Sequence, residues 1–547
     1  MKILQYWHTI RYLKPVQIYG RVGYRMRRPA IEEGNLPRCR ERTGPWIEGA
    51  QKTPGMPGPG RFCFLNEEKT LRGPGDWNHP GWDKLWLYNL HYFDDLNGRD
   101  AEERKAWHEE YIRRWIGENP PGKGNGWEPY PTSLRIVNWI KWILKGNAPV
   151  PGMLQSLGLQ ARRLRRRLEY HLLGNHLLAN LKALVFAGCF FEGAEADEWL
   201  AKGLGEMQRE LREQVLPDGG HFERSPMYHA IILEDLLDCI GVCGTYPEAV
   251  IHGFSTVVEA LRKACVRMLR WLALMTHPDG GIVLFNDAAF GIAPVTEELV
   301  SYASRLGIRP DASPALPLVH LGETGYIRVE RGPFTGFLDV APIGPDYLPG
   351  HAHADTLNFE LSVRGQRVIV DSGTSCYGTG IERQRQRSTA AHNTVEIDGE
   401  NSSEVWGGFR VARRAYPRDL EMREDGEAIV VACSQDGYRR LPGKPVHRRE
   451  WRMDGNRLVI TDGVEGRFSE AVSRFHFHPD VRVESMDSAE GRLRLAGGQA
   501  LRWSVQGGEV AVVPSSYHPQ FGISLPCQCL EIRFKNDDPQ ITQISAD

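Results

Sequence analysis

The chain has 547 residues, of which 41% are hydrophobic and 25% are charged, a mixture typical of globular rather than disordered proteins. Its 67 Lys and Arg nearly balance its 69 Asp and Glu, and the net charge of −2 argues against a bulk electrostatic grip on nucleic acid or on an anionic membrane, although not against a local basic groove. The sequence has no run of about 18 apolar residues, so we expect no membrane-spanning helix. The 10 cysteines form no C-x-x-C pair and favour buried thiols in a reducing compartment.

The first 80 residues predict an arm followed by a loop. MKILQYWHTIRYLKP lacks both an apolar core of about 7–15 residues and a small-residue cleavage site, so it does not resemble a secretory signal. We therefore expect a cytoplasmic protein, or a periplasmic one if an unusual export route is used. Residues 1–45 are basic and amphipathic, which predicts a helical arm packed on the body. Residues 50–80 are rich in Gly and Pro and favour irregular structure.

Residues 81–310 predict a helical domain. Apolar residues recur at helical spacing in SLRIVNWIKWILKG, LEYHLLGNHLLANLKALVFAG, YHAIILEDLLDCIGVC and VVEALRKACVRMLRWLALMTHPDGG. Two matching stops, LPDGG at 216–220 and HPDGG at 277–281, each follow a predicted helix and precede a short extended piece. Their recurrence indicates stacked helical hairpins in a ring or solenoid, although a chance repeat of this turn is the simpler alternative.

Residues 320–547 predict antiparallel strands, because the apolar period changes to two. GYIRVERG, LNFELSVRGQRVIVDSG, HNTVEIDG, EAIVVACSQDG and HRREWRMDGNRLVITDGVEG alternate apolar and polar residues between Gly-containing turns. The number of strands fits a sandwich of sheets. The Pro-rich stretch IRPDASPALPL at 308–318 marks the expected boundary between the helical and β halves.

The densest polar cluster is HAHAD at 351–355. In a strand, His351 and His353 would point the same way. Asp371 ends the predicted strand VIVDSG and His392 opens the predicted strand HNTVEIDG, so two His and one Asp on neighbouring strands can supply three ligands to one Zn²⁺. A hydrogen-bonded polar patch is the alternative.

Three places in the helical half carry polar or aromatic candidates. Asn175 and His176 interrupt an apolar helix pattern, as residues pointing into a groove would, although a core pair or a kink would look the same. Tyr228 follows Pro226, a residue suited to a helix start, and is either a proton carrier or a packing tyrosine. Trp127 and Arg135 form an aromatic–Arg cluster that fits an acidic sugar and fits structural packing equally well.

Arginines at 383, 385 and 387 alternate just before His392 and would place three cations on one edge. A solvated face is the default interpretation of such a run. Beside a metal or a catalytic His, an edge that binds carboxylate or sulfate becomes an equal alternative.

Five segments together resemble the heparinase II/III-like polysaccharide lyases, a family related to heparan-sulfate and alginate lyases. They keep the family's order and spacing from residue 171 to 410, and they are LLGNHLLANLKALVFAG, ERSPMYHAIILEDLLD, PGHAHADTLNFELSV, VIVDSGTSCYG and RSTAAHNTVEIDG. The resemblance implies a multidomain fold, an N-terminal incomplete (α/α) toroid followed by a C-terminal antiparallel β-sandwich, with the active site in the cleft between them. This agrees with the change of period along the chain.

The resemblance also implies cleavage of a uronic-acid-containing polysaccharide by β-elimination. Such a reaction needs the uronate carboxylate neutralised, a base for the C5 proton and an acid for the leaving O4. By match to the family, Asn175 would hydrogen-bond the carboxylate with His176 beside it. Tyr228 would be the base, the acid or both in turn, and His351 would be the other proton carrier.

The same resemblance assigns His353, Asp371 and His392 to one divalent metal, most simply a structural Zn²⁺. It places Arg135 and Arg387, with Trp127, on the substrate side. The first 120 residues, with YNLHYFDDL at 88–96, are similar to an accessory region of relatives associated with bacterial surface-polysaccharide production. The implied partner is an acidic polysaccharide, and the sequence leaves the polymer and the oligomeric state open.

Two other functions compete with the lyase. A metal-dependent hydrolase could use the His351/His353 pair, with Asp355 as a base for a metal-activated water. A non-catalytic protein that binds acidic glycans would need no proton carrier, so its affinity would not depend on the Tyr228 hydroxyl.

Overall fold

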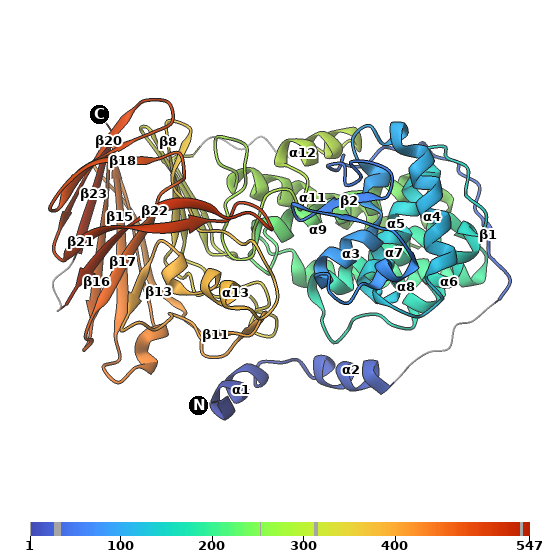
Figure 1. The fold of residues 1–547 in the computed structure, drawn as a ribbon, viewed down its shortest axis with the longest axis horizontal. Coiled ribbons are helices and arrows are strands. Elements are labelled where there is room, and N and C mark those ends of the chain that lie inside the picture. Colours follow the sequence, from blue (N-terminus) through green and yellow to red (C-terminus); the bar gives the residue numbers. More distant parts are fainter. Residues whose placement is uncertain (1, 27–33, 252, 311–315, 536–539, 547) are drawn as a thin grey trace.

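Most helices precede the larger sheets along the chain, and the computed structural model describes residues 2–26, 34–251, 253–310, 316–535 and 540–546 (Figure 1). The helices are α1 (Lys2–Ile10), α2 (Pro15–Met26), α3 (Lys84–Tyr92), α4 (Lys105–Glu118), α5 (Pro129–Leu144), α6 (Met153–Arg165), α7 (Gly174–Phe190), α8 (Ala194–Gln214), α9 (Pro226–Thr245), α10 (Pro247–Val250), α11 (Ser255–Leu274), α12 (Thr296–Arg305) and α13 (Ile381–Gln386).

The strands are β1 (Arg38–Cys39), β2 (Arg61–Phe64), β3 (Glu67–Thr70), β4 (Phe191–Glu192), β5 (Leu318–Leu321), β6 (Tyr326–Arg331), β7 (Phe334–Asp339), β8 (Phe359–Val363), β9 (Gln366–Ile369), β10 (Val395–Ile397), β11 (Val405–Trp406), β12 (Arg410–Val411), β13 (Pro417–Asp425), β14 (Ala428–Gln435), β15 (Val446–Asp454), β16 (Arg457–Glu465), β17 (Ala471–His476), β18 (Arg482–Asp487), β19 (Glu490–Arg494), β20 (Ala500–Gln506), β21 (Glu509–Tyr517), β22 (Leu525–Phe534) and β23 (Gln540–Ala546).

The helical half contains inner and outer helices. α7 and α9 are buried along almost their whole length, which matches sequences that are apolar on all sides. α8 and α11 bury one face only and pack against α7 and α9. Antiparallel pairs of one buried and one half-exposed helix form the predicted (α/α) toroid, so this part of the fold class is confirmed.

The two PDGG turns have the same hydrogen bonds. The Leu216 amide donates to the Gly220 carbonyl at 2.9 Å, and the His277 amide donates to the Gly281 carbonyl at 2.8 Å. In each turn the Asp side chain accepts from the amide two residues on, Asp218 at 3.0 Å and Asp279 at 2.9 Å. The recurrence is therefore structural and marks two equivalent helix exits.

The β half contains three larger antiparallel sheets, which confirms the predicted sandwich. Their strand orders are β5-β6-β7-β8-β9, β10-β17-β22-β21 and β13-β14-β15-β16-β23-β20-β19-β18. On β15, buried and half-buried residues alternate, as the period of two predicts. A shared apolar core joins the three sheets and includes Phe359, Trp451 and Phe475.

A separate apolar cluster joins the two halves. Trp271 and Met275 at the end of α11 pack with Tyr326 and Phe337 of β6 and β7. The Trp271 indole also donates to the Thr324 hydroxyl at 3.0 Å. Part of the predicted boundary, residues 311–315, lies outside the described residues, and the β half begins at Leu318 in β5.

The N-terminal arm, α1 and α2, runs along one side of the molecule beneath both halves (Figure 1). Its contacts reach the β half through Trp406, whose indole donates to the Thr9 hydroxyl at 3.1 Å, and the helical half through His171, which stacks on Tyr24 with ring centroids 4.2 Å apart. The arm therefore touches both halves. Among the described residues, none of the helices has the length and apolar character needed to span a membrane.

Candidate functional site

Asn175 lies at the start of α7, not inside a longer helix. The interruption of the apolar helix pattern seen in the sequence is a helix start, because the chain turns at Leu173 and Gly174, with φ angles of 64° and 53°. A Cβ on Gly174 would lie 2.4 Å from Glu223 Oε1, so only glycine fits here. The backbone N–H of Asn175 then donates to that same Glu223 oxygen at 3.2 Å. The tight turn brings the helix start against the Glu223 carboxyl group.

Tyr228 is placed by the start of α9, which begins at Pro226 as predicted. Ser225 caps the helix by accepting from the Tyr228 amide at 3.2 Å. The Tyr228 hydroxyl lies 3.0 Å from that of Tyr377. Burial raises the pKa of Tyr228 well above its ordinary value, and the neighbouring Tyr377 adds to the shift. The phenol is therefore protonated in the absence of substrate.

His351 comes from the β half and stacks on Tyr228, with ring centroids 3.8 Å apart and planes 27° from parallel. Its Nε2 atom lies 3.5 Å from the Asn175 amide nitrogen Nδ2 and 3.4 Å from Glu223 Oε2. The predicted catalytic residues Asn175, Tyr228 and His351 therefore meet where the two halves join.

His351 and His353 bind one carboxylate. Neither lies in a strand, so the predicted strand geometry is wrong; they lie in the connection between β7 and β8. Their rings nevertheless turn to the same group, because His351 Nδ1 is 2.9 Å from Asp287 Oδ2 and His353 Nε2 is 2.9 Å from Asp287 Oδ1. The bond from Nδ1–H to Asp287 leaves His351 Nε2 directed at Asn175 and Glu223.

Arg383 completes this group by donating to both Asp287 oxygens. Burial alone would raise the pKa of Asp287, but the Arg383 guanidinium and the hydrogen bonds from His351 and His353 hold it well below its ordinary value. Burial lowers the pKa of His353 to about 4, against the opposing effect of Asp287. Asp287 is thus a fixed negative charge on the helical side that orients two imidazoles of the β side.

His176, beside Asn175, carries its own carboxylate partner. Its Nδ1 atom lies 3.3 Å from Glu169 Oε2, and its ring lies 4.6 Å from that of Tyr130. Burial lowers the pKa of His176, but Glu169 outweighs it and the net shift is upward. The His176 side chain keeps 33% of its surface exposed, so the imidazole is accessible.

The predicted metal ligands lie in one buried group. His392 Nδ1 is 2.7 Å from Asp371 Oδ2, and the His353 and His392 rings are 5.2 Å apart. One ligand atom each from Asp355, Asp371 and His392 lies within 4.8 Å of the others, so Asp355 rather than the expected His353 completes this cluster of three. Three buried atoms here have no protein partner: His353 Nδ1, His392 Nε2 and Asp355 Oδ2. Imidazole nitrogens and carboxylates left unpaired in one place fit a divalent cation.

The residues expected on the substrate side are buried structural groups. Arg135 is fully buried, stacks on Trp115 and donates to the carbonyls of His91 and Gly126. Trp127 is 4% exposed, and its indole donates to the Asn119 carbonyl at 3.2 Å. These contacts correct the prediction that Arg135 and Trp127 face a sugar, because their polar atoms are satisfied inside the helical core.

The arginine run is helical, so its alternate side chains do not share an edge. Arg383 and Arg387 are fully buried around α13, whereas Arg385 pairs with Glu382 nearer the surface. Arg387 donates to the carbonyl of Ala352 at 2.9 Å and so supports the backbone between the two histidines. The predicted cationic edge is wrong, and so is a substrate-facing Arg387.

Sequence reasoning missed Glu223, Asp287, Tyr377 and Arg383 as members of this group. No local pattern identifies Asp287, which lies in the irregular segment between α11 and α12. A structural signal does accompany the missed carboxylates, because Arg224 and Asn286 have φ angles of 58° and 60° beside Glu223 and Asp287. Non-glycine residues in this region are uncommon and often lie at functional sites.

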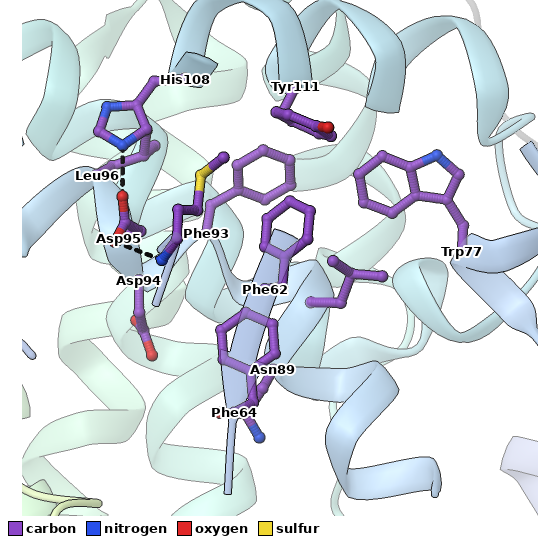
Figure 2. A pocket seen from close by; sticks show the side chains of 12 residues that line it. Phe62, Phe64, Trp77, Asn89, Phe93, Asp94, Asp95, Leu96, His108 and Tyr111 are labelled. Atoms are coloured by element: carbon purple, nitrogen blue, oxygen red, sulfur yellow. Dashed lines mark hydrogen bonds and ion pairs between the residues drawn. The ribbon is translucent and has the colours of Figure 1, made fainter. Parts of the chain in front are cut away.

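A cavity elsewhere in the helical half lies apart from this group (Figure 2). It holds about 20 Å³ and is lined largely by aromatic side chains, including Phe62, Phe64 and Trp77. Asp95, at one side, accepts from His108 and Arg104. No predicted catalytic or metal residue lines the cavity, and its volume suits at most about one water. It is a packing defect rather than a substrate site.

Two family models match the chain in succession. Residues 97–306 match the heparinase II/III N-terminus, and residues 313–545 match the heparinase II/III-like C-terminal domain. The two matches fall on the helical and the β half.

Individual relatives are about a quarter identical to this chain over the aligned regions. A heparin-sulfate lyase of Bacteroides stercoris is 26% identical over 338 residues, covering 57% of this chain and 47% of that protein. FtsZ-localized protein C of Caulobacter vibrioides is 24% identical over 401 residues, covering 68% and 64%. The alignment with the first relative thus spans about half of its length.

Solved structures share the fold. The crystal structure of a heparinase III superposes with a TM-score of 0.71 at 18% identity, covering 87% of this chain and 80% of that one. The similarity extends over both halves and supports the arrangement of toroid and sheets described above.

Proposed function

Because the chain belongs to the heparinase II/III-like family, we propose that it is a polysaccharide lyase that cleaves a uronic-acid-containing polymer by β-elimination. The observation that carries this proposal is the stacking of Tyr228 on His351 beside Asn175. Two proton carriers from different halves of the fold, with an amide donor next to them, are what the reaction requires.

The first requirement is neutralisation of the substrate carboxylate. The C5 proton of a uronate is weakly acidic, and charge builds on the carboxyl group as that proton leaves. Asn175 can donate to a carboxylate oxygen, and His176 lies beside it with a pKa that Glu169 raises, against the effect of burial. An amide donor and an adjacent imidazole, when protonated, would stabilise the developing charge.

The second requirement is a base and an acid. One of Tyr228 and His351 takes the C5 proton, the C4–O4 bond breaks as the C4=C5 double bond forms, and the leaving O4 receives a proton from the same or the other residue. The stacked rings keep the phenol oxygen and the imidazole Nε2 close to one sugar position. Which of the two residues takes the C5 proton depends on the face of the sugar that is presented to them.

The third requirement is orientation of His351. Asp287 accepts from Nδ1, and Arg383 fixes Asp287 with bonds to both of its oxygens. This arrangement selects the tautomer that carries its hydrogen on Nδ1, so that the unprotonated Nε2 faces Asn175. Asp287 and Arg383 are positioning residues in this proposal.

We assign one divalent metal, Zn²⁺ most simply, to His353, His392 and Asp371, with Asp355 as an additional ligand. The unpaired nitrogen and oxygen atoms at His353, His392 and Asp355 support this assignment. Bound there, the ion would supply a fixed positive charge that holds the β side of the site in shape. His353 would then connect the ion to Asp287.

The test measures ultraviolet absorbance while the purified protein is incubated with a panel of acidic polysaccharides. The panel contains heparan sulfate, hyaluronan, alginate, polyglucuronate and the surface polymer of the source organism; the last member tests a role in surface-polysaccharide metabolism. A rise with the wild type that Tyr228→Phe lacks would establish elimination. Tyr416→Phe removes a hydroxyl bonded to Asp346 in the β half and should behave as the wild type.

Other outcomes identify the competing functions. A flat trace with tight binding to one polymer, unchanged in Tyr228→Phe, would replace the lyase with a glycan-binding protein. New reducing ends without a rise in absorbance would indicate hydrolysis, and a metal-dependent hydrolase would then replace the lyase.

A further inference from the structure

The N-terminal arm exposes an apolar face. The most exposed side chains of α1 and α2 recur at spacings of one, three and four, which places each set on one side of its helix. They are Ile3, Leu4, Trp7 and Ile10 on α1 and Ile18, Tyr19, Val22 and Met26 on α2, with exposed fractions between 48% for Ile10 and 86% for Ile3. We refer to these eight side chains as the arm's apolar face.

The opposite side of each helix is the side that holds the arm to the body. On α2, Gln17 is 5% exposed and donates to the Tyr347 carbonyl at 3.1 Å, and Tyr24 stacks on His171. On α1, the Thr9 hydroxyl accepts from the Trp406 indole. Tyr6 and Val16 also contact the body, Tyr6 through Trp406 and Val16 through the helical core. The eight side chains of the apolar face are nevertheless exposed, so each helix presents apolar residues to solvent as well as to the protein.

The charge of the arm is also one-sided. Residues 1–31 contain seven Lys or Arg and no Asp or Glu, although the whole chain has a net charge of −2. Arg21 and Arg25 are exposed on α2 next to the apolar face. The cations of the segment are Lys2, Arg11, Lys14, Arg21, Arg25, Arg27 and Arg28. Such a segment attracts an anionic partner over a distance set by the ionic strength.

From these observations we infer that the arm binds the surface of an anionic phospholipid membrane, with its apolar face in the headgroup region. An amphipathic helix with Trp, Ile and Leu on one side and Lys or Arg beside them lies in a bilayer interface in this way. The apolar face supplies burial, and the basic residues supply attraction to anionic lipid headgroups. The inference is independent of the proposed lyase activity.

Charge favours this partner over a second copy of the chain. A symmetric pairing through the apolar faces would bring two segments of seven cations and no anions together, and like charges oppose such a contact. An anionic lipid surface neutralises the same cations.

The experiment is flotation of the full chain with vesicles of phosphatidylglycerol and phosphatidylcholine, compared with phosphatidylcholine alone. The protein should float with the anionic vesicles, less with the neutral ones, and less as salt increases. Val22→Glu places a charge in the apolar face and should weaken partitioning by about tenfold or more. Val295→Glu is the matched control, because Val295 is 62% exposed outside the arm while Val22 is 54% exposed.

Circular dichroism and thermal unfolding establish that both variants fold. Failure of the wild type to float with anionic vesicles would overturn the inference, and so would equal losses in Val22→Glu and Val295→Glu. Sedimentation that shows a dimer broken by Val22→Glu would assign the apolar face to a second copy instead. Because flotation uses no polysaccharide, its outcome is separate from that of the absorbance test.

Discussion

Glu223 and Asp287 lie on opposite nitrogens of one imidazole ring, that of His351. Each follows one of the two PDGG turns, so both carboxylates enter the site from equivalent helix exits of the toroid. Glu223 Oε2 is 3.4 Å from His351 Nε2, and Asp287 Oδ2 is 2.9 Å from Nδ1. Their pKa values shift in opposite directions: burial raises that of Glu223, whereas Arg383 and the two histidines, against the effect of burial, lower that of Asp287. Two carboxyl groups whose pKa values shift in opposite directions therefore flank the same ring.

Asp287→Asn should reduce kcat by about 100-fold or more, because the His351 tautomer and ring orientation lose their anionic partner. It should also lower the free energy of unfolding by about 3–5 kcal/mol, since Arg383 stays buried without its counter-charge. Steady-state kinetics and denaturant unfolding measure the two effects. A fall in stability with kcat unchanged would remove Asp287 from the positioning of His351.

Glu223→Gln should be nearly neutral at low pH and become relatively more stable than the wild type as pH rises. Burial raises the pKa of Glu223, so folding favours its protonated form, and the wild type loses stability as pH rises from the ordinary value of 4.5 through the higher folded value. Gln can keep the oxygen that accepts from the Asn175 amide. Unfolding free energies of both proteins at several pH values test this, and a pH-independent difference would contradict it.

Asp238→Asn should destabilise the helical half by about 3–5 kcal/mol. The Asp238 carboxylate lies 2.5 Å from both the Lys141 and the Lys182 ammonium groups, deep in the toroid. Asp425→Asn is the matched control; it breaks an exposed pair with Arg452 and should leave the free energy of unfolding almost unchanged.

The same carboxylate predicts acid sensitivity. Burial raises the pKa of Asp238, but the two lysines outweigh it and lower the pKa from 3.8 to about 2. A depressed folded pKa contributes stability that is present above 3.8 and lost as pH falls toward about 2, an effect of about 2 kcal/mol. Asp238→Asn should lack this part of the pH dependence in unfolding measured between pH 2 and 5.

His392→Ala should remove the bound metal and lower the melting temperature. The variant loses the imidazole that pairs with Asp371 and carries an unpaired Nε2. Elemental analysis of purified protein should find one divalent ion in the wild type and none in the variant. His478→Ala, which removes a half-buried His near Asp480, should keep the metal. Equal metal content in all three proteins would contradict the assignment.

Arg135→Met should reduce stability without changing KM. The substitution leaves the carbonyls of His91 and Gly126 without this donor in the helical core, at a cost of about 1–3 kcal/mol each. A raised KM in a variant of unchanged stability would instead indicate that Arg135 contacts the substrate. Thermal unfolding and KM, measured on the same preparation, separate the two roles.

The order of helices and sheets could be predicted because period and turn residues are local properties. The resemblance grouped Asn175, Tyr228 and His351, and the structure brings these three residues together, whereas their roles stay predictions. The interruption of the helix pattern at Asn175 could be seen in the sequence, but the reason for glycine at 174 could not, because it depends on contact with Glu223 from a distant segment. Charges were the least predictable, because burial of Arg135 and Arg387 depends on contacts from distant segments.

The contact between the two halves also sets a spacing within the site. Tyr228 belongs to the toroid and His351 to the β half, so the apolar contact of Trp271 with Tyr326 helps to set the distance between their rings. A change of residue volume in that contact would move one ring relative to the other without altering either. Residues outside the substrate-binding site could therefore help to determine which widths of polymer the site accepts.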